Sequence, residues 1–155
     1  MLVAAMLVVG ATILWLADRL GRRSDGIERL GFAGAIGIGC AQALALVPGI
    51  SRSGISISAG LALGLTREAA TRFSFLMATP VVAGAGIFEL KKLLAGEVAS
   101  DVNGGAIVIG FVAAVVSGLA AIHVLLRFVR SHPMTVFVAY RLLLAAVVVI
   151  VVLAA

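Results

Sequence analysis

Three long apolar segments constrain the fold of this chain more than any other feature. They cover residues 69–90, 106–128 and 134–155 and contain few charged side chains. Crossing a hydrocarbon layer about 30 Å thick takes roughly 20 helical residues, because an α-helix rises about 1.5 Å per residue. Each segment is therefore predicted to be a transmembrane helix, and Thr66 can cap the first of them. Residues 1–17 are similarly apolar but shorter, and are predicted to form a fourth transmembrane helix.

The overall composition indicates that most of the protein surface faces lipid. Of the 155 residues, 63% are hydrophobic and 12% are charged, whereas a soluble domain is about 45–50% apolar and about 25% charged. A larger core cannot absorb this difference, because so short a chain leaves much of its surface outside the core. The predicted fold class is therefore an all-α integral membrane protein with a single membrane domain over residues 1–155.

Two shorter apolar segments flank a polar break in the chain. Residues 32–47 and 55–65 would form helices about 24 Å and about 17 Å long, so neither is expected to cross the hydrocarbon layer alone. Two short helices joined by a polar break are typical of re-entrant hairpins and discontinuous helices, where membrane proteins place ligands. Residues 32–65 are predicted to form a re-entrant broken-helix hairpin.

The charged residues predict an orientation and exclude one class of partner. The formal net charge is +5, but the basic residues lie at the ends of apolar segments rather than in a patch interleaved with aromatics, which argues against nucleic acid. One side of the predicted membrane carries eight arginines: Arg19, Arg22, Arg23, Arg29, Arg67, Arg72, Arg127 and Arg130. The other side has Lys91 and Lys92, offset by Glu97 and Asp101. The arginine-rich side is predicted to be cytoplasmic, which leaves the loop 91–105 and the C-terminus outside.

The polar break carries the residues with the clearest chemical potential. Residues 48–58 read Pro-Gly-Ile-Ser-Arg-Ser-Gly-Ile-Ser-Ile-Ser. Proline ends the first half-helix, Gly49 permits a sharp turn, and Gly54 lets the backbone approach a ligand closely. The second half-helix, expected to begin near Gly54, directs unpaired N–H groups and the positive end of its dipole into the break. Such a helix start attracts anions.

Side chains of the break complete a predicted phosphate site. Hydroxyl groups come from Ser51, Ser53 and Ser56, and Arg52 adds a planar, permanently charged fork that matches phosphate oxygens. An arginine within a membrane costs about 2.5–3.5 kcal/mol on insertion scales and is a functional hypothesis by default. The alternative is that Arg52 reaches to water or neutralises carbonyl groups at the end of the first half-helix. Arg141, about two turns into the last predicted helix, is a second candidate.

Other polar side chains in the apolar segments are given structural interpretations. Arg72 most simply anchors the end of a helix on the arginine-rich side. His123 lies within an apolar segment and is interpreted as a packing or hydrogen-bonded residue, and His132 as a solvated turn residue beside a proline.

Three stretches resemble one known family. Residues 42–57, Gln-Ala-Leu-Ala-Leu-Val-Pro-Gly-Ile-Ser-Arg-Ser-Gly-Ile-Ser-Ile, closely resemble the second signature of the bacterial undecaprenyl-pyrophosphate phosphatases, the bacitracin-resistance protein family. Residues 72–80, Arg-Phe-Ser-Phe-Leu-Met-Ala-Thr-Pro, and 137–141, Phe-Val-Ala-Tyr-Arg, also look like that family. The resemblance covers essentially the whole chain at matching spacing.

This resemblance implies an enzyme of cell-wall synthesis in the bacterial plasma (inner) membrane. The family hydrolyses undecaprenyl pyrophosphate to undecaprenyl phosphate and inorganic phosphate, and its fold has two inverted repeats, each with a re-entrant helix pair. Carried over to this chain, the catalytic residues would be Ser51, Arg52 and Ser53, with Arg52 stabilising charge on the transferred phosphoryl group. The substrate-binding residues would be Gly49, Gly54 and Ser56.

The chain resembles only the second half of the family, plus one preceding helix. The family's first repeat carries a glutamate-rich motif and a Ser-Ser-Ser-Gly-His stretch, which supply carboxylates, a histidine and contacts to a divalent cation, Mg²⁺ or Ca²⁺. The chain contains neither motif. It is therefore expected to be a fragment, a degenerate homologue, or a half-length protein that pairs with a missing N-terminal repeat or a second copy in a homodimer.

Two other functional interpretations stay open at this stage. Broken helices suit a transporter or flippase half that binds an anionic lipid headgroup without hydrolysing it. A non-catalytic scaffold is the third alternative, in which Arg52 could be replaced without consequence.

Overall fold

The computed structural model describes residues 1–95 and 104–154, and within them every regular element is a helix. The predicted all-α class is confirmed. The elements are α1 (Leu2–Leu20), η1 (Ile27–Arg29), α2 (Phe32–Gln42), η2 (Ala43–Leu46), α3 (Arg52–Ala62), α4 (Arg67–Leu94), α5 (Gly104–Ser131) and α6 (Thr135–Ala154). The predicted loop residues 96–103, which include Glu97 and Asp101, lie outside the described residues, and so does Ala155.

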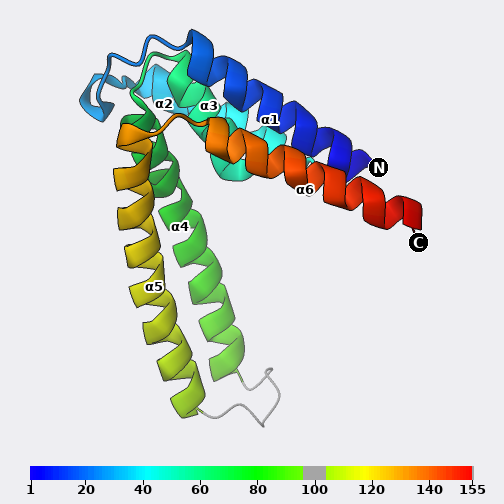
Figure 1. Cartoon of the computed structure of the whole chain (residues 1–155). Helices are drawn as coiled ribbons and strands as arrows, with labels where there is room; N and C mark the ends of the chain where they lie inside the picture. The colour runs from blue at the N-terminus through cyan, green and yellow to red at the C-terminus, as the bar shows by residue number, and fades with distance from the viewer. Residues whose placement is uncertain (96–103, 155) are drawn as a thin grey trace.

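Two helical arms diverge from one corner of the molecule (Figure 1). Helices α1 and α6 lie side by side in the first arm, and both termini lie at its far end. Helices α4 and α5 form the second arm. The short helices α2 and α3 lie at the first arm, where α3 contacts both α1 and α4. The corner is therefore the place where all the helices of the fold come closest.

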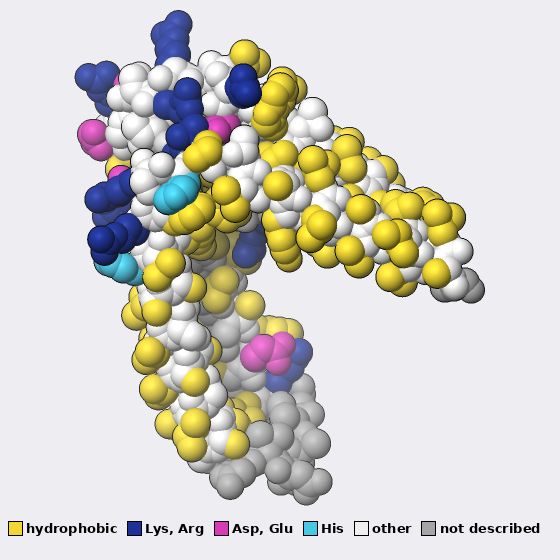
Figure 2. Space-filling model, in the orientation of Figure 1, with side chains coloured by type: hydrophobic (Ala, Val, Ile, Leu, Met, Phe, Trp, Pro, Cys, Tyr) yellow, Lys and Arg dark blue, Asp and Glu magenta, His cyan; other side chains and the backbone are white. Residues whose placement is uncertain are grey.

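Four helices, α1, α4, α5 and α6, are long and apolar enough to cross a membrane. Their outer faces carry exposed large apolar side chains such as Phe111 and Ile150, which are 69% and 65% exposed (Figure 2). A soluble protein rarely exposes so much apolar surface to water, so lipid must cover it. The chain is therefore a multi-pass membrane protein.

The two short helices start and finish at the same end of α1. The amides of Ser24 and Asp25 donate hydrogen bonds to the carbonyl oxygen of Gly64 at 3.0 and 3.1 Å, and the amide of Thr66 donates to the carbonyl oxygen of Asp25 at 2.9 Å. Helices α2 and α3 pack against each other between these points. The chain thus returns to the corner after the polar break, while the depth of this helix pair in a membrane stays a prediction.

A buried acid joins three helices at the corner. Asp18, near the end of α1, is 5% exposed. Its carboxylate accepts two hydrogen bonds from Arg67 at the start of α4, at 2.6 and 3.0 Å, and one from the amide of Met134 at 3.2 Å. The same corner holds a cluster of buried apolar side chains that pack against one another, among them Leu14, Ile38, Leu61, Leu65, Val129 and Met134. The corner therefore combines an apolar core with a close ion pair between Asp18 and Arg67, to which Arg23 adds a longer contact of 3.8 Å with Asp18.

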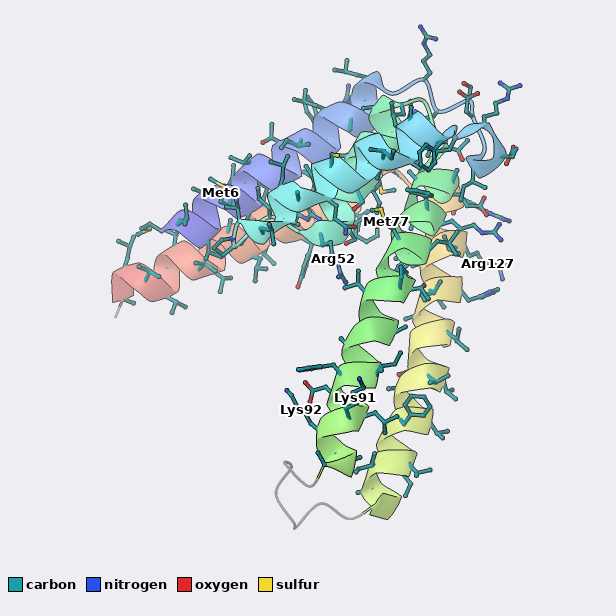
Figure 3. All side chains as sticks on the ribbon, turned by 180° about the vertical axis from the view of Figure 1, so that it is seen from behind. Met6, Arg52, Met77, Lys91, Lys92 and Arg127 are labelled. Carbon is teal, nitrogen blue, oxygen red and sulfur yellow. The ribbon has the colours of Figure 1, made fainter. Side chains whose placement is uncertain are left out.

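The charged side chains lie mainly at the two ends of the α4–α5 arm. Arginines gather at the corner (Figure 2), whereas Lys91 and Lys92 project near the far end of α4 (Figure 3). This arrangement agrees with the arginine-rich side predicted from the sequence.

Gly49 gives the first testable prediction. Its backbone has φ +101°, and an added Cβ would lie 2.6 Å from the carbonyl oxygen of Val3 and 2.8 Å from the Cβ of Met6. Gly49→Ala is therefore expected to lower the free energy of unfolding by about 1–3 kcal/mol, measured by detergent-induced unfolding. Gly84→Ala is the control, because that helical glycine faces open space. Equal stability of the two variants would contradict the prediction.

Candidate functional site

Helix α3 begins within the polar break, and its first turn has free donors. Ser51 is the N-cap residue: its hydroxyl oxygen accepts a hydrogen bond from the amide of Gly54 at 3.3 Å and lies 3.3 Å from the hydroxyl of Ser53. Helix α3 starts at Arg52, two residues before the predicted start. Within the described part of the chain, no acceptor faces the amides of Arg52 and Ser53. The helix start therefore presents two unpaired N–H groups and the positive end of its dipole.

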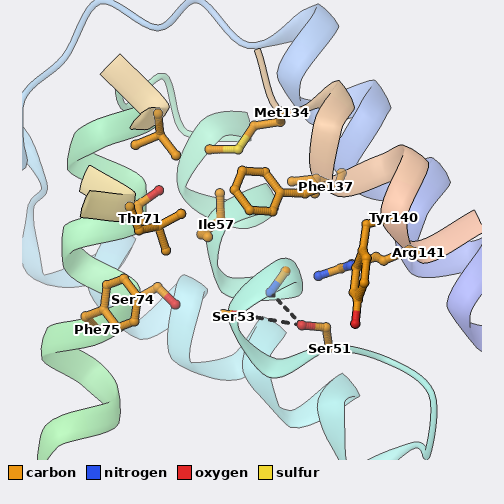
Figure 4. A pocket seen from close by; sticks show the side chains of 14 residues that line it. Ser51, Ser53, Ile57, Thr71, Ser74, Phe75, Met134, Phe137, Tyr140 and Arg141 are labelled. Carbon is orange, nitrogen blue, oxygen red and sulfur yellow. Dashed lines mark hydrogen bonds between the residues drawn. The ribbon is translucent and has the colours of Figure 1, made fainter. Parts of the chain in front are cut away.

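A cavity of about 210 Å³ lies against this helix start (Figure 4). Its polar wall comes from three helices: Ser51, Ser53 and Gly54 at the start of α3, Thr71 and Ser74 on α4, and Tyr140 and Arg141 on α6. The rest of the wall is apolar and includes Ile57, Phe75 and Phe137. An anion in this cavity would meet hydroxyl groups and a guanidinium in mostly apolar surroundings, which strengthen electrostatic attraction.

A second hollow of about 340 Å³ shares the same serines. Ser51, Ser53 and Ser74 line both spaces, and Arg52 and Gln42 are added in the second. Figure 3 shows Arg52 near the corner, on the side of the open angle between the two arms. The three serines therefore lie between two arginines, Arg141 in the first space and Arg52 in the second.

Arg141 reaches the site because two glycines leave room for it. A Cβ added to Gly54 would lie within 2.6 Å of the guanidinium carbon of Arg141, and a Cβ added to Gly10 on α1 would lie 3.5 Å from one of its nitrogens. In the described residues, no carboxylate pairs with this partly buried guanidinium. Its charge is therefore available to an anion in the cavity.

Ser74 is a site residue to which the sequence interpretation gave no role. It is 6% exposed, and its side chain points toward the cavity (Figure 4). Its hydroxyl makes no hydrogen bond within the described chain, whereas the neighbouring Thr71 donates to the carbonyl oxygen of Arg67 at 2.8 Å. The hydroxyl oxygen of Ser74 is accessible at the cavity wall rather than sealed in the core, so it has a free donor for a ligand. Its place in the Arg-Phe-Ser stretch was the available signal.

Two of the six predicted site residues do not line either space. Ser56 is buried, and its hydroxyl donates to two acceptors: the carbonyl oxygen of Arg52 at 2.8 Å and Oε1 of Gln42 at 3.1 Å. The contact with Gln42 joins α3 to α2. Gly49 packs against α1. The structure therefore brings Ser51, Arg52, Ser53 and Gly54 together at the site, but not Ser56 and Gly49.

The described residues do not fit a divalent cation. Neither space is lined by an acid or a histidine. Within residues 1–95 and 104–154, no three side chains of His, Cys, Asp or Glu lie close enough together to hold a metal ion. Mg²⁺ and Ca²⁺ prefer several oxygen ligands, carboxylates above all.

Gly54→Ala tests whether Arg141 needs this glycine to reach the cavity. The methyl group would displace the guanidinium, and a charge-assisted hydrogen bond contributes about 1.5–3 kcal/mol. The affinity for inorganic pyrophosphate is therefore expected to fall at least about tenfold, measured by isothermal titration calorimetry. Arg141→Ala should give a similar loss, and the double variant should lose little more than either single variant. Additive losses would contradict a shared cause.

Comparison with known proteins identifies relatives along almost the whole chain. The family described as bacitracin resistance protein BacA matches residues 1–147. A protein named undecaprenyl-diphosphatase from Alcanivorax borkumensis is 44% identical over 144 residues, which cover 93% of this chain and 54% of the relative. Proteins of the same name from Rubrobacter xylanophilus and Moorella thermoacetica are 46% and 42% identical over 86% and 96% of this chain, and 48% and 55% of their own lengths.

These matches establish the family and show how much of it the chain spans. The chain covers about half the length of the curated relatives it matches. Ser51, Arg52 and Ser53 of the break and Arg141 of α6 all lie within the matched residues 1–147. The chain therefore belongs to the bacitracin resistance protein BacA family.

Proposed function

We propose that this chain supplies the phosphate-binding half of an undecaprenyl-diphosphate phosphatase. The reaction would hydrolyse undecaprenyl pyrophosphate with one water molecule to give undecaprenyl phosphate and inorganic phosphate. The observation that carries the proposal is the placement of free amides, three serine hydroxyls and two arginines around two adjoining hollows. The names of the relatives add the substrate: each is called an undecaprenyl-diphosphatase.

The chain would contribute positioning and charge stabilisation to this reaction. Phosphoryl transfer depends mainly on aligning the groups and on stabilising charge on the phosphate oxygens. Arg52 would bind the oxygens of the transferred phosphoryl group, with Arg141 on the phosphate that stays with the lipid. The hydroxyls of Ser51, Ser53 and Ser74 and the first amides of α3 would hold the oxygens between them. The surrounding apolar wall would limit water to the attacking molecule.

The base that activates water would come from outside these residues. None of the side chains that line the two hollows is an acid or a histidine, and arginine stays protonated. A missing N-terminal repeat with its carboxylates and histidine, or a second copy of this chain, would complete the site. Any divalent cation would be held mainly by the missing N-terminal repeat, because the described residues of this chain do not bring three metal-binding side chains together.

The membrane placement forms part of the same proposal. The helix pair α2–α3 would enter the bacterial plasma (inner) membrane from the arginine-rich side and return to it. The irregular backbone around Gly49 would then face protein and the substrate cavity, where its polar groups can be satisfied. The lipid tail of the substrate would remain in the surrounding hydrocarbon while its pyrophosphate reaches the start of α3.

A transporter half is the alternative from another functional class, and the names of the relatives do not favour it. Both functions need an anion site made by broken helices. They differ in the product, because only the phosphatase releases inorganic phosphate.

The test measures phosphate release from undecaprenyl pyrophosphate in detergent with magnesium or calcium. One arm contains the purified chain alone, and the other adds the glutamate-bearing repeat of a full-length relative. Release by the chain alone would indicate that a second copy completes the site. Release only in the second arm would indicate a split active site. Absence of release in both arms, with substrate still bound, would contradict the phosphatase and favour the transporter.

A further inference from the structure

A basic hollow lies between the first turns of α4 and the last turns of α5, on the outer flank of that arm. It has a volume of about 610 Å³ and is lined by Glu68, Arg72, His123, Leu126, Arg127 and Arg130. Figure 3 shows Arg127 on the outer side of α5, away from Arg52. The space-filling view shows basic side chains and a histidine gathered at this edge (Figure 2). The basic hollow is therefore separate from the candidate site.

An ion pair fixes one side of the basic hollow. Arg130 donates to both carboxylate oxygens of Glu68, with Nε–Oε2 and Nη2–Oε1 distances of 2.6 and 2.5 Å. This bidentate ion pair joins α4 to α5, and the two charges neutralise each other. By contrast, Arg72 and Arg127 make no hydrogen bond or ion pair within the described part of the chain. Two guanidinium groups from two helices thus line one hollow, and Glu68, the one acid in its described lining, is already bound by Arg130 and attracts Arg72 without a hydrogen bond.

The helical spacing explains why these two arginines line the same hollow. Arg72 lies four residues after Glu68 on α4, and Arg127 lies three residues before Arg130 on α5. Residues three or four apart share a helix face, so both arginines lie one turn deeper than the ion pair on the faces that it brings together. Two planar forks arranged in this way suit the several oxygens of a phosphate group.

The depth of the basic hollow matches the headgroup layer of a membrane. Helices α4 and α5 each contain 28 residues, so each is about 42 Å long, whereas the hydrocarbon layer is about 30 Å thick. Each helix therefore extends about 6 Å beyond the hydrocarbon at either end. Arg72 and Arg127 lie within about 8 Å of their helix ends, at the hydrocarbon boundary, and long arginine side chains reach the lipid phosphates from there. Leu126 adds an apolar side chain to the lining, and His123, one turn deeper on α5, adds a ring nitrogen.

We propose that the basic hollow is a second phosphate-binding site, with Arg72 and Arg127 as its ligands. Its depth favours the phosphate of an anionic phospholipid headgroup in the arginine-rich leaflet, and inorganic phosphate shares the same chemistry. Basic pockets between transmembrane helices on the cytoplasmic side bind anionic headgroups in this way. The site goes beyond the proposed hydrolysis, because neither arginine lines the hollows around Ser51.

The test compares two double variants that remove the same charge from the same end of the molecule. Arg72→Gln with Arg127→Gln removes the ligands, and Arg19→Gln with Arg22→Gln removes two exposed arginines outside the basic hollow. Native mass spectrometry counts the phosphatidylglycerol and phosphatidylcholine bound from mixed micelles, and calorimetry measures inorganic phosphate in lipid-free micelles. The dissociation constant for phosphatidylglycerol is expected to rise about thirtyfold in the first variant, and clearly less in the control.

The two arms distinguish the sources of the phosphate. Selective loss of phosphatidylglycerol binding in the first variant would support a lipid headgroup. Selective loss of inorganic phosphate binding, without a preference among lipids, would support free phosphate. Equal losses in both double variants would indicate only a general attraction to negative surfaces and would overturn the proposal, as would an absence of binding in both arms. Far-UV circular dichroism confirms that each variant is folded, because Arg19 lies over the ring of Trp15 and its replacement would change the tryptophan fluorescence directly.

Discussion

Arg52→Ala is expected to reduce phosphate release from undecaprenyl pyrophosphate by about 10²–10³-fold, the usual loss when one preorganised donor to a developing oxyanion is removed. Arg52 is exposed in the hollow that it shares with Ser51, Ser53 and Ser74, so its guanidinium can reach a ligand without first breaking another contact. The measurement is the initial rate with saturating substrate, in whichever assembly of the chain is active.

Two further variants make this result specific. Arg52→Lys keeps the charge but loses the planar fork, so its rate should fall between those of the original protein and Arg52→Ala. Arg22→Ala removes an exposed arginine near the other end of α3, outside both hollows, and should leave the rate unchanged. A rate for Arg52→Ala within about threefold of the original would contradict a role in stabilising the transition state, because such a role is worth far more.

The membrane helices could be predicted because the length of an apolar segment reports directly on the thickness that it can cross. The predicted ends of these helices were less accurate than their number, since the helices continue past the apolar residues into the headgroup layer. Helix α4 begins at Arg67, where Thr66 accepts a hydrogen bond from the amide of Ala69 at 3.2 Å, as its predicted capping role requires. At its other end α4 runs through Lys91 and Lys92.

The local part of the candidate site could also be predicted, because the motif at the polar break is contiguous. Proline, glycine and serine determine where α3 starts, and that start carries the free amides. The orientation of the individual side chains could not be read in the same way. Ser56 lies three residues after Ser53, about 60° round the helix, and its hydroxyl meets Gln42 on α2 instead of the cavity. Such a difference depends on how the neighbouring helices pack.

Contacts between distant parts of the chain escaped sequence interpretation. Arg141 is about ninety residues from Ser51 in the sequence, and only the packing of both α6 and α3 against α1 places its guanidinium against Gly54. An unpaired arginine in an apolar helix was a general sign of function, but it named no partner. The buried ion pair of Asp18 was even harder to predict, because Asp18 lies among charged residues after an apolar segment, where acids are usually hydrated.

The second large effect is expected at Asp18. Asp18→Ala should lower the free energy of unfolding by about 3–5 kcal/mol, because removing one partner of a buried pair leaves the other charge uncompensated. Arg67, with 23% of its side chain exposed, would lose both of its hydrogen bonds, and the amide of Met134 would lose its acceptor. The measurement is detergent-induced unfolding followed by the fluorescence of Trp15, three residues before Asp18 on α1.

The control is an ion pair with the same chemistry in a more exposed place. Asp25 and Arg29 are 2.9 Å apart, but their side chains are 30% and 73% exposed, so Asp25→Ala should lower stability by about 1 kcal/mol or less. The variant that combines Asp18→Ala with Arg67→Ala should be less destabilised than the sum of the single variants. Arg67 is then no longer left without its partner, and Arg23, the other basic residue beside Asp18, is 38% exposed. Equal losses of unfolding free energy in Asp18→Ala and Asp25→Ala would contradict the prediction. Apolar packing alone would then stabilise the corner, and the buried ion pair would only fix the relative positions of α1, α4 and α6.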